Sequence, residues 1–329
     1  MTPWQLRDWR SMALASALVL TALALVVPRV TVQRTVYNVM AFVDITGSMK
    51  VRDMGSAEAP VERLEAAKAV LQRLVGDLPC KSRLGLGLFT ERRGFVLFNP
   101  IEVCENFAPI EQSIANIDWR MGWEGDSMVA KGLHHAIAET ALVDADIIFL
   151  TEGQEAPPLP PGGALPEFDG ERGKVKGLIA GVGGQAKVPI PRFDGEGHET
   201  GAYAEQDVVQ ENRTGAPPPD AEQRPGYHPK WAPFGSDPPT GDEHLSSVRT
   251  AHLSALAAQT GLAYAGLQEE PDLLGAVMRA AHPHQTSVAV DVRPYPASLA
   301  LLALLGVYAA PLAARALAKI SHHKTGQRS

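Results

Sequence analysis

The sequence predicts an α/β fold with a doubly wound, mostly parallel sheet, flanked by a membrane-spanning helix at each end of the chain. Two observations support this prediction. Apolar runs typical of buried strands alternate with amphipathic helical patterns between residues 36 and 281. Residues 11–28 and 294–314 contain no charged side chain, and each is close to the length of a spanning helix. A proline-rich stretch at residues 215–240 does not fit a compact α/β core and predicts an irregular insertion in the domain.

The flanks of the two apolar segments predict their orientation. Arg7 and Arg10 precede the first segment. The tail behind the second segment carries Arg315, Lys319, Lys324 and Arg328 and no acidic residue. By the positive-inside rule both termini are cytoplasmic, which places residues 35–291 on the far side of the membrane. A signal peptide cleaved after the alanines at 22 and 24 is the alternative for the first segment, and an apolar core helix is the alternative for the second.

Charge is distributed unevenly along the chain. Residues 1–34 carry four Arg and one Asp, and residues 292–329 carry five basic residues and no acidic one. The net charge of −7 therefore leaves −15 on the segment between them. We expect such an acidic domain to bind no nucleic acid and to tolerate a divalent cation well.

The domain between the apolar segments alternates strands and helices in chain order. Strands are predicted at residues 36–43, 83–90, 94–100, 146–151, 176–182, 262–267 and 286–292. Helices are predicted at residues 60–78, 107–117, 128–141, 250–260 and 271–281. The first of these helices, for example, places Leu64, Ala67 and Leu71 on one face. The strands at 83–90 and 94–100 flank a charged turn, which predicts a hairpin.

An irregular insertion is predicted at about residues 187–245. Within it, residues 215–240 contain eight prolines among 26 residues, too many for a helix or an internal strand. A second proline- and glycine-rich stretch, residues 155–166, directly follows the strand at 146–151. Long irregular segments in compact domains are usually functional or disordered.

Oxygen-bearing side chains follow the first strand of the domain. Asp44, Thr46 and Ser48 alternate along the turn after residues 36–43, so their side chains can converge on one ion. Carboxylate and hydroxyl oxygens are the ligands that Mg²⁺ and Ca²⁺ prefer. The alternative is a structural turn, in which Asp44 caps a helix and the hydroxyls bond turn amides.

Two further polar residues occur at places where a parallel sheet presents ligands. Ser127 precedes the helix at 128–141, and Glu152 follows the apolar strand at 146–151. Ligands of doubly wound sheets bind at the carboxyl ends of the strands. Taken separately, Ser127 could be a helix N-cap and Glu152 an exposed turn residue.

Together these residues resemble the three metal-binding loops of the von Willebrand factor A (vWA) domain, whose metal-ion-dependent adhesion site binds acidic partner residues through the metal. The resemblance implies that Asp44, Thr46, Ser48, Ser127 and Glu152 hold one divalent cation, Mg²⁺ or Ca²⁺. Ser127 stands where the family has threonine, and it keeps the hydroxyl. Glu152 stands where the family has an aspartate outside the direct metal ligands, and its extra methylene lets the carboxylate reach about 1 Å further.

Longer stretches of sequence, here called phrases, restrict the resemblance to one group of vWA proteins. They lie at residues 43–49, 78–80, 88–91, 103–106, 130–134, 181–184 and 241–246. These phrases look like the membrane-bound vWA accessory proteins encoded in bacterial methanol dehydrogenase clusters. That family implies an inner-membrane protein with a periplasmic domain, acting in the maturation, including metal insertion, of a PQQ-dependent, calcium-containing dehydrogenase. Its partners would be that dehydrogenase or its other maturation factors.

Two other readings remain open. One is a metal-independent scaffold, and the other is a stress-tolerance vWA protein that works beside an AAA⁺ chaperone. The chain has no G-x-S-x-G and no H-E-x-x-H motif, so we expect a binding module and not an enzyme.

The chain has two cysteines, Cys80 and Cys104. An even count in an oxidising compartment favours a disulfide, which would close a loop of about 25 residues. Two buried free thiols are the alternative.

Overall fold

A computed structural model describes most of the chain. The described residues are 3–26, 29–56, 58–122, 125–160, 163–236, 238–268 and 272–325. The chain divides into two compact units, one formed by Met1–Arg34 with Gln285–Ser329 and the other by Thr35–His284. Parts of five segments used in the sequence predictions lie outside the described residues, namely 27–28 of the first apolar segment, 161–162 of the stretch at 155–166, 237 of the insertion, 271 of the last domain helix and 326–329 of the basic tail.

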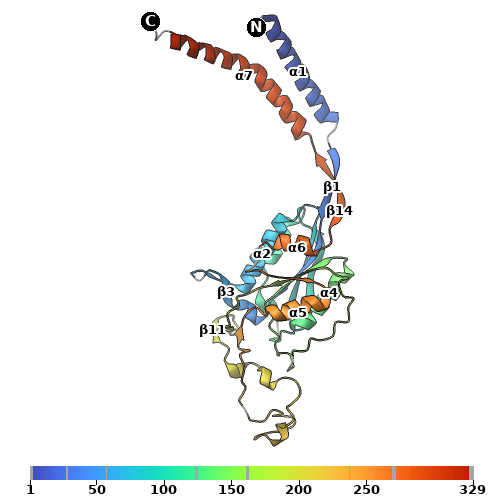
Figure 1. The fold of residues 1–329 in the computed structure, drawn as a ribbon, viewed down its shortest axis with the longest axis vertical. Helices are drawn as coiled ribbons and strands as arrows, with labels where there is room; N and C mark the ends of the chain where they lie inside the picture. The colour runs from blue at the N-terminus through green and yellow to red at the C-terminus, as the bar shows by residue number, and fades with distance from the viewer. Residues whose placement is uncertain are drawn as a thin grey trace. The chain divides into compact units, whose positions relative to one another are not determined.

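The terminal unit contains two helices and a two-stranded sheet (Figure 1). Its elements are α1 (Pro3–Val26), β1 (Arg29–Val36), β14 (His284–Asp291) and α7 (Pro294–Thr325). Because β14 pairs with β1 and not with the large sheet, residues 285–291 belong to this unit. The sequence assigned them to the central domain.

One helical segment among the described residues, Trp9–Val26 in α1, is long and apolar enough to cross a membrane by length and composition. A second apolar stretch, Pro294–Ala310 in α7, is shorter. A signal sequence near the N-terminus has the same length and composition as the first segment, so cleavage stays an alternative. The second span at 294–314 and the orientation of the domain stay predictions.

The second unit is built on a mostly parallel, six-stranded sheet with strand order β13-β8-β7-β2-β5-β6. The strands are β2 (Asn38–Asp44), β5 (Arg83–Thr90), β6 (Arg93–Glu102), β7 (Asp146–Thr151), β8 (Gly177–Gly181) and β13 (Ala263–Gly266). All neighbours are parallel except β6, which forms the predicted hairpin with β5. The prediction of a mixed α/β fold is confirmed, and the strand order with its flanking helices is consistent with a vWA-like fold.

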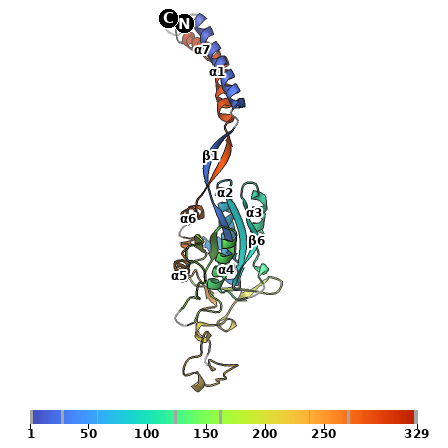
Figure 2. The same ribbon diagram turned by 90° about the vertical axis from the view of Figure 1, so that its right-hand side faces the viewer.

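Helices cover both faces of this sheet (Figures 1 and 2). On one face lie α2 (Arg63–Asp77), α3 (Phe107–Ala115) and α6 (Leu273–Ala280), and on the other α4 (Val129–Leu142) and α5 (Thr250–Thr260). Along β2, Val39, Ala41 and Val43 pack toward the first face, whereas Met40 and Phe42 pack toward the second. A strand buried on both faces reads as a continuous apolar run, which is why the sequence signal was clear.

The prediction that a helix begins at residue 60 is wrong. Residues Pro60–Glu62 form β4, which pairs antiparallel with β3 (Arg52–Gly55), and α2 begins at Arg63. The N–H of Arg63 donates to the carbonyl of Val51 (3.0 Å), so the hairpin and the helix start are joined. Helical periodicity in the sequence begins at Leu64 and carries no information about this pairing.

The insertion between β8 and α5 is irregular, as predicted, and is held by two short strand pairs. β9 (Val188–Pro189) pairs with β12 (Leu245–Ser246), and β10 (Pro191–Phe193) pairs with β11 (Glu199–Ala202). Single 3₁₀ turns lie between them at η3 (Glu205–Asp207), η4 (Glu211–Arg213) and η5 (Ala221–Gln223). Because β9 and β12 pair at its two ends, the insertion leaves and rejoins the domain at one place (yellow in Figure 1).

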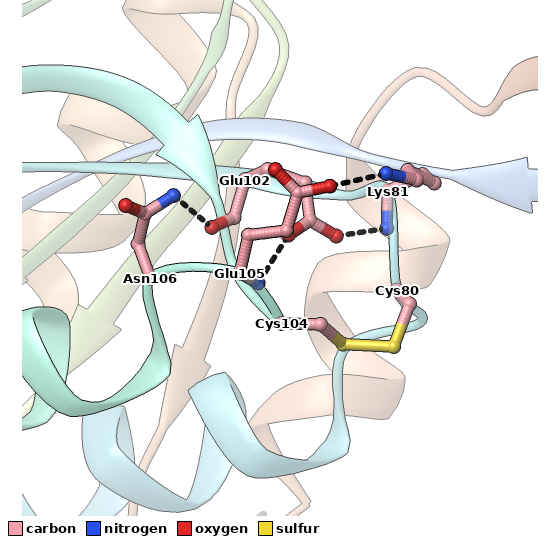
Figure 3. The surroundings of a disulfide bond; sticks show 6 residues. All are labelled: Cys80, Lys81, Glu102, Cys104, Glu105 and Asn106. Atoms are coloured by element: carbon pink, nitrogen blue, oxygen red, sulfur yellow. Dashed lines mark hydrogen bonds and ion pairs between the residues drawn. A yellow bond between two sulfur atoms is a disulfide. The ribbon is translucent and has the colours of Figure 1, made fainter.

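Cys80 and Cys104 are joined in a disulfide that links the end of α2 to the segment after β6. Figure 3 shows that the Glu102 carboxylate lies beside it and accepts the backbone N–H groups of Lys81 and Glu105, each at 2.5 Å. Both cysteines thus belong to one corner of the domain, on the side opposite the carboxyl ends of β2 and β7.

Candidate metal centre

The order of the strands places two of the predicted loops side by side. β2 lies between β5 and β7, so the chain crosses to opposite sides of β2 at this point of the sheet. Ligands of open α/β sheets bind at such a switch point, outside the carboxyl ends of the strands. β2 ends at Asp44 and β7 ends at Thr151, in parallel register.

Hydroxyl groups fix the orientation of the Asp44 side chain, which is fully buried. One carboxylate oxygen, Oδ1, accepts the backbone N–H of Thr46 (2.9 Å) and its Oγ1 hydroxyl (2.8 Å). The other, Oδ2, accepts the hydroxyl of Thr151 (2.6 Å). Thr151 was not among the predicted site residues. Its place at the end of β7, one residue before Glu152, is the sequence signal that could have found it.

Glu152 reaches the first loop. The hydroxyl of Thr46 lies 3.2 Å from that of Ser48, and the Ser48 hydroxyl donates a short hydrogen bond to Glu152 Oε1. The Glu152 side chain is fully buried, so it is not the exposed turn residue of the alternative reading. The structure thus places Asp44, Thr46, Ser48 and Glu152 in one hydrogen-bonded network.

Ser127 is held between two neighbouring loops by its backbone. Its N–H and C=O both bond Ala156 (2.7 Å each), in the segment after β7. On its other side it forms a parallel bridge with Glu91, just after β5. The Ser127 side chain is buried and lines the same cavity as Thr46 and Ser48, and its hydroxyl accepts or donates no hydrogen bond among the described residues. It is therefore not the N-cap of α4.

Two buried oxygens of the candidate ligand residues have no hydrogen-bond partner in the part of the chain that the structure describes. Ser127 Oγ and Glu152 Oε2 are buried and make no hydrogen bond to any described residue. Buried polar atoms in native proteins nearly always have a partner, and each exception calls for an explanation. Two carboxylates and three hydroxyls, with two of their oxygens unpartnered, match the oxygen ligands of Mg²⁺ or Ca²⁺. The residues present therefore fit the cation that the sequence implies.

The electrostatics of the two carboxylates lead to the same conclusion. Burial, and then the nearby charge of Glu152, raise the pKa of Asp44 well above its usual range. Burial also raises the pKa of Glu152, although the charge of Arg63 and the Ser48 hydroxyl oppose this. Two adjacent buried carboxylates disfavour each other's charged forms, and a cation between them would favour both.

Arg63 bonds the backbone of the loop that carries Thr46 and Ser48, and the sequence did not predict this role. Its side chain is fully buried, with Nε and Nη2 bonded to the two Asp53 oxygens (2.9 and 2.6 Å). Nη1 donates to the Ser246 hydroxyl (2.6 Å) and to the Ser48 carbonyl (3.3 Å). Arg63 therefore connects the first loop with the β3–β4 hairpin and with the end of the insertion. An arginine at a helix start gives no sequence signal of such a role.

A cavity of about 620 Å³ adjoins the network. Its polar side includes Thr46, Ser48 and Ser127. The insertion contributes Ile190, Tyr203, Asp207, Val208, Val209 and Glu243 to its lining. The predicted insertion thus covers the candidate site, which the sequence did not establish.

The histidines at residues 134 and 282 do not join this network. His134 Nε2 lies 3.1 Å from Gln259 Oε1, and its ring packs on that of Phe168. His282 Nδ1 lies 2.8 Å from Asp146 Oδ1, at the start of β7. Both contacts are structural. The first joins α4 to α5, and the second lies at the end of β7 opposite the candidate site.

Comparisons with known proteins give similarities of fold. No protein-family model and no curated protein matches the chain by sequence. An aerotolerance-related membrane protein from Bacteroides fragilis aligns over 74% of this chain and 97% of its own, with 15% identity and a TM-score of 0.44. BatB from Bacteroides thetaiotaomicron aligns over 74% and 98%, with 15% identity and a TM-score of 0.43. A von Willebrand factor type A protein from Catenulispora acidiphila aligns over 38% and 28%, with 14% identity and a TM-score of 0.26. Similarities of this size carry no inference about ligand or pathway.

Proposed function

We propose that this chain is a membrane-anchored module that binds a divalent cation at the carboxyl edge of its sheet and, through it, a carboxylate of a client protein. The observation that carries the proposal is that two buried oxygens, Ser127 Oγ and Glu152 Oε2, have no hydrogen-bond partner among the described residues, in the loops that accompany the buried carboxylate of Asp44. They lie at the switch point of the sheet, where ligands of this fold class bind.

The residues of the site would have different roles in holding the cation. Asp44 and Glu152 supply negative charge, and Thr46, Ser48 and Ser127 supply neutral oxygens. Thr151 and the Thr46 backbone hold the Asp44 carboxylate in position. When bound, Mg²⁺ or Ca²⁺ would supply positive charge and a coordination position for an incoming carboxylate. The adjoining cavity leaves room for that ligand.

We further propose that the client is a periplasmic PQQ-dependent methanol dehydrogenase or one of its other maturation factors. The support is the resemblance of the phrases around Asp44, Cys80, Cys104 and Gly183 to the accessory proteins of that pathway. A periplasmic location agrees with the basic flanks of the two apolar segments and with the acidic domain between them. Deleting the gene should leave the dehydrogenase without its calcium.

The metal site is tested by measuring Mg²⁺ and Ca²⁺ binding to the full-length chain in detergent. Asp44→Asn removes one of the two buried charges at equal volume, and we expect cation affinity to fall at least tenfold. Asp146→Asn is the matched control, because Asp146 is also buried but lies at the opposite end of the sheet. Equal cation affinity of the native chain and the Asp44→Asn variant would refute the proposal.

One observation favours a second candidate, a scaffold that needs no cation. Thr46, Ser48 and Thr151 already satisfy most of the oxygens of Asp44 and Glu152 within the network. A scaffold predicts that the native chain binds no divalent cation and that Asp44→Asn leaves client binding intact. Client binding measured with and without EDTA separates the two candidates.

A further inference from the structure

The insertion changes the kind of ligand that the site can receive. A globular partner needs a broad and nearly flat contact area of about 800 Å². Here the cation network adjoins a cavity of about 620 Å³, with Tyr203, Val208 and Val209 of the insertion on its wall. Cavities of roughly 300–1,000 Å³ enclose small ligands or short segments. The geometry therefore favours a short chain segment over a protein face.

An unpartnered acceptor lies on the cavity wall next to the metal loops. Gln154 is buried, and its Nε2 donates to the carbonyls of Glu243 (2.9 Å) and Leu245 (3.3 Å). These bonds fix which end of the amide is the oxygen. Gln154 Oε1 then has no partner among the described residues. A buried acceptor of this kind would be satisfied by a ligand that carries N–H donors.

The ionisable side chains that line the cavity are all acidic among the described residues. The acidic lining residues are Asp126, Glu155, Asp207 and Glu243, and the described lining contains no lysine or arginine. Arg192 and Arg249 approach Asp207 and Glu243 at 3.7 and 3.8 Å, but neither lines the cavity. A carboxylate entering alone would meet this negative field, whereas a carboxylate accompanied by a cationic group would not.

We propose that the cavity binds a short segment of a client chain in which an acidic residue lies beside a lysine or arginine. This inference rests on the proposed function, because the acidic residue binds at the cation held by Asp44 and Glu152. The ammonium or guanidinium group of the neighbour donates to Gln154 Oε1 and lies among the wall carboxylates. The apolar side of the cavity, with Ile190 and Val208, receives the aliphatic part of that side chain.

The test uses the full-length chain in detergent and three blocked, fluorescent eight-residue peptides with a central aspartate in a Ser/Gly background. The aspartate is flanked by two lysines, two alanines or two glutamates. In saturating Mg²⁺ or Ca²⁺, we expect the lysine peptide to bind about fivefold more tightly than the alanine peptide, and the glutamate peptide to bind most weakly. The preference should shrink at high salt, because exposed charges are screened.

Single substitutions locate the preference on the cavity wall. Asp126→Asn and Asp207→Asn should each reduce the advantage of the lysine peptide, and Gln154→Leu should reduce the affinity for the lysine peptide alone. Glu222→Gln makes the same charge change on the exposed part of the insertion, outside the cavity, and should have no effect.

The outcomes separate this inference from the proposed function. Equal binding of all three peptides, or no binding while the cation binds, overturns the inference and leaves the metal site standing. A lysine preference that persists in EDTA and in Asp44→Asn overturns the metal-bridged function and keeps the preference for a basic neighbour. Absence of both cation and peptide binding overturns both.

Discussion

At the scale of single residues, Glu152 is the most informative departure from the pattern that the sequence resembles. The longer side chain was expected to reach further than aspartate, and it does extend to the Ser48 hydroxyl of the first loop. Its second oxygen is buried and has no partner in the described part of the chain. The extra methylene therefore brings the carboxylate into the network and does not remove it from the site.

Glu152→Gln separates the charge of this residue from its shape. Gln keeps the volume and an oxygen that can accept from Ser48, but it removes one of the two buried negative charges. We expect cation affinity to fall tenfold or more, because one of the two charges that would hold the cation is lost. Calorimetric cation titration measures the affinity. A cation affinity equal to that of the native chain would show that Glu152 does not act on the cation.

At the scale of elements, the backbone of the loop after β8 packs closely on the guanidinium of Arg63. A Cβ at Gly183 would lie 2.7 Å from Arg63 Nε, and the residue has a φ of +131°. The glycine-rich phrase at residues 181–184 begins at the last residue of β8. Its glycine is explained here by close packing on a buried arginine that also bonds the Ser48 carbonyl.

Gly183→Ala tests this packing, and Gly201→Ala is its control because the two glycines have nearly the same φ. Gly201 in β11 has a φ of +130°, and a Cβ at this residue would meet nothing within 4 Å, so Gly201→Ala reports backbone strain alone. We expect Gly201→Ala to cost about 1 kcal/mol and Gly183→Ala roughly 2–4 kcal/mol, because Arg63 must also shift. Denaturant unfolding measures both. Cation affinity should fall only in Gly183→Ala, and equal losses of stability in the two variants would contradict the role of the Arg63 contact.

At the scale of the whole molecule, the sequence arranges a basic terminus, an acidic domain and a second basic terminus. Of the two apolar segments, Trp9–Val26 is long and apolar enough to span a membrane within the described residues. The orientation that we expect rests on the positive-inside rule, which concerns charge in short loops near the spans. This rule acts while the chain is inserted into the membrane, so the orientation cannot be read from the structure of the folded domain.

Cysteine labelling in intact bacterial cells tests the orientation. Glu222→Cys, on the exposed part of the insertion, should react with a membrane-impermeant maleimide if the domain lies outside the cytoplasm, as the positive-inside rule predicts. Lys324→Cys, in the basic tail, should react only after the membrane is permeabilised. Labelling of both positions in intact cells would show that the second apolar segment does not span the membrane.

The sequence by itself determined the six strands of the main sheet, the helices that pack on it and the polar residues at the strand ends. Strands such as β2 and β7 are buried on both faces, so their apolar runs are local signals. Because parallel strands present their carboxyl ends at one edge, Asp44 and Glu152 could be assigned to one site before any contact was known.

Only the tertiary structure decided the contacts that join distant segments. Arg63 pairs with Asp53 and Ser246, Thr151 holds Asp44, and β4 replaces the first turn of the predicted helix. Each depends on pairing across many residues, which periodicity does not encode. The covering of the site by the insertion was hidden for the same reason, because an irregular segment is positioned by its packing and its two anchoring strands and not by a repeating pattern.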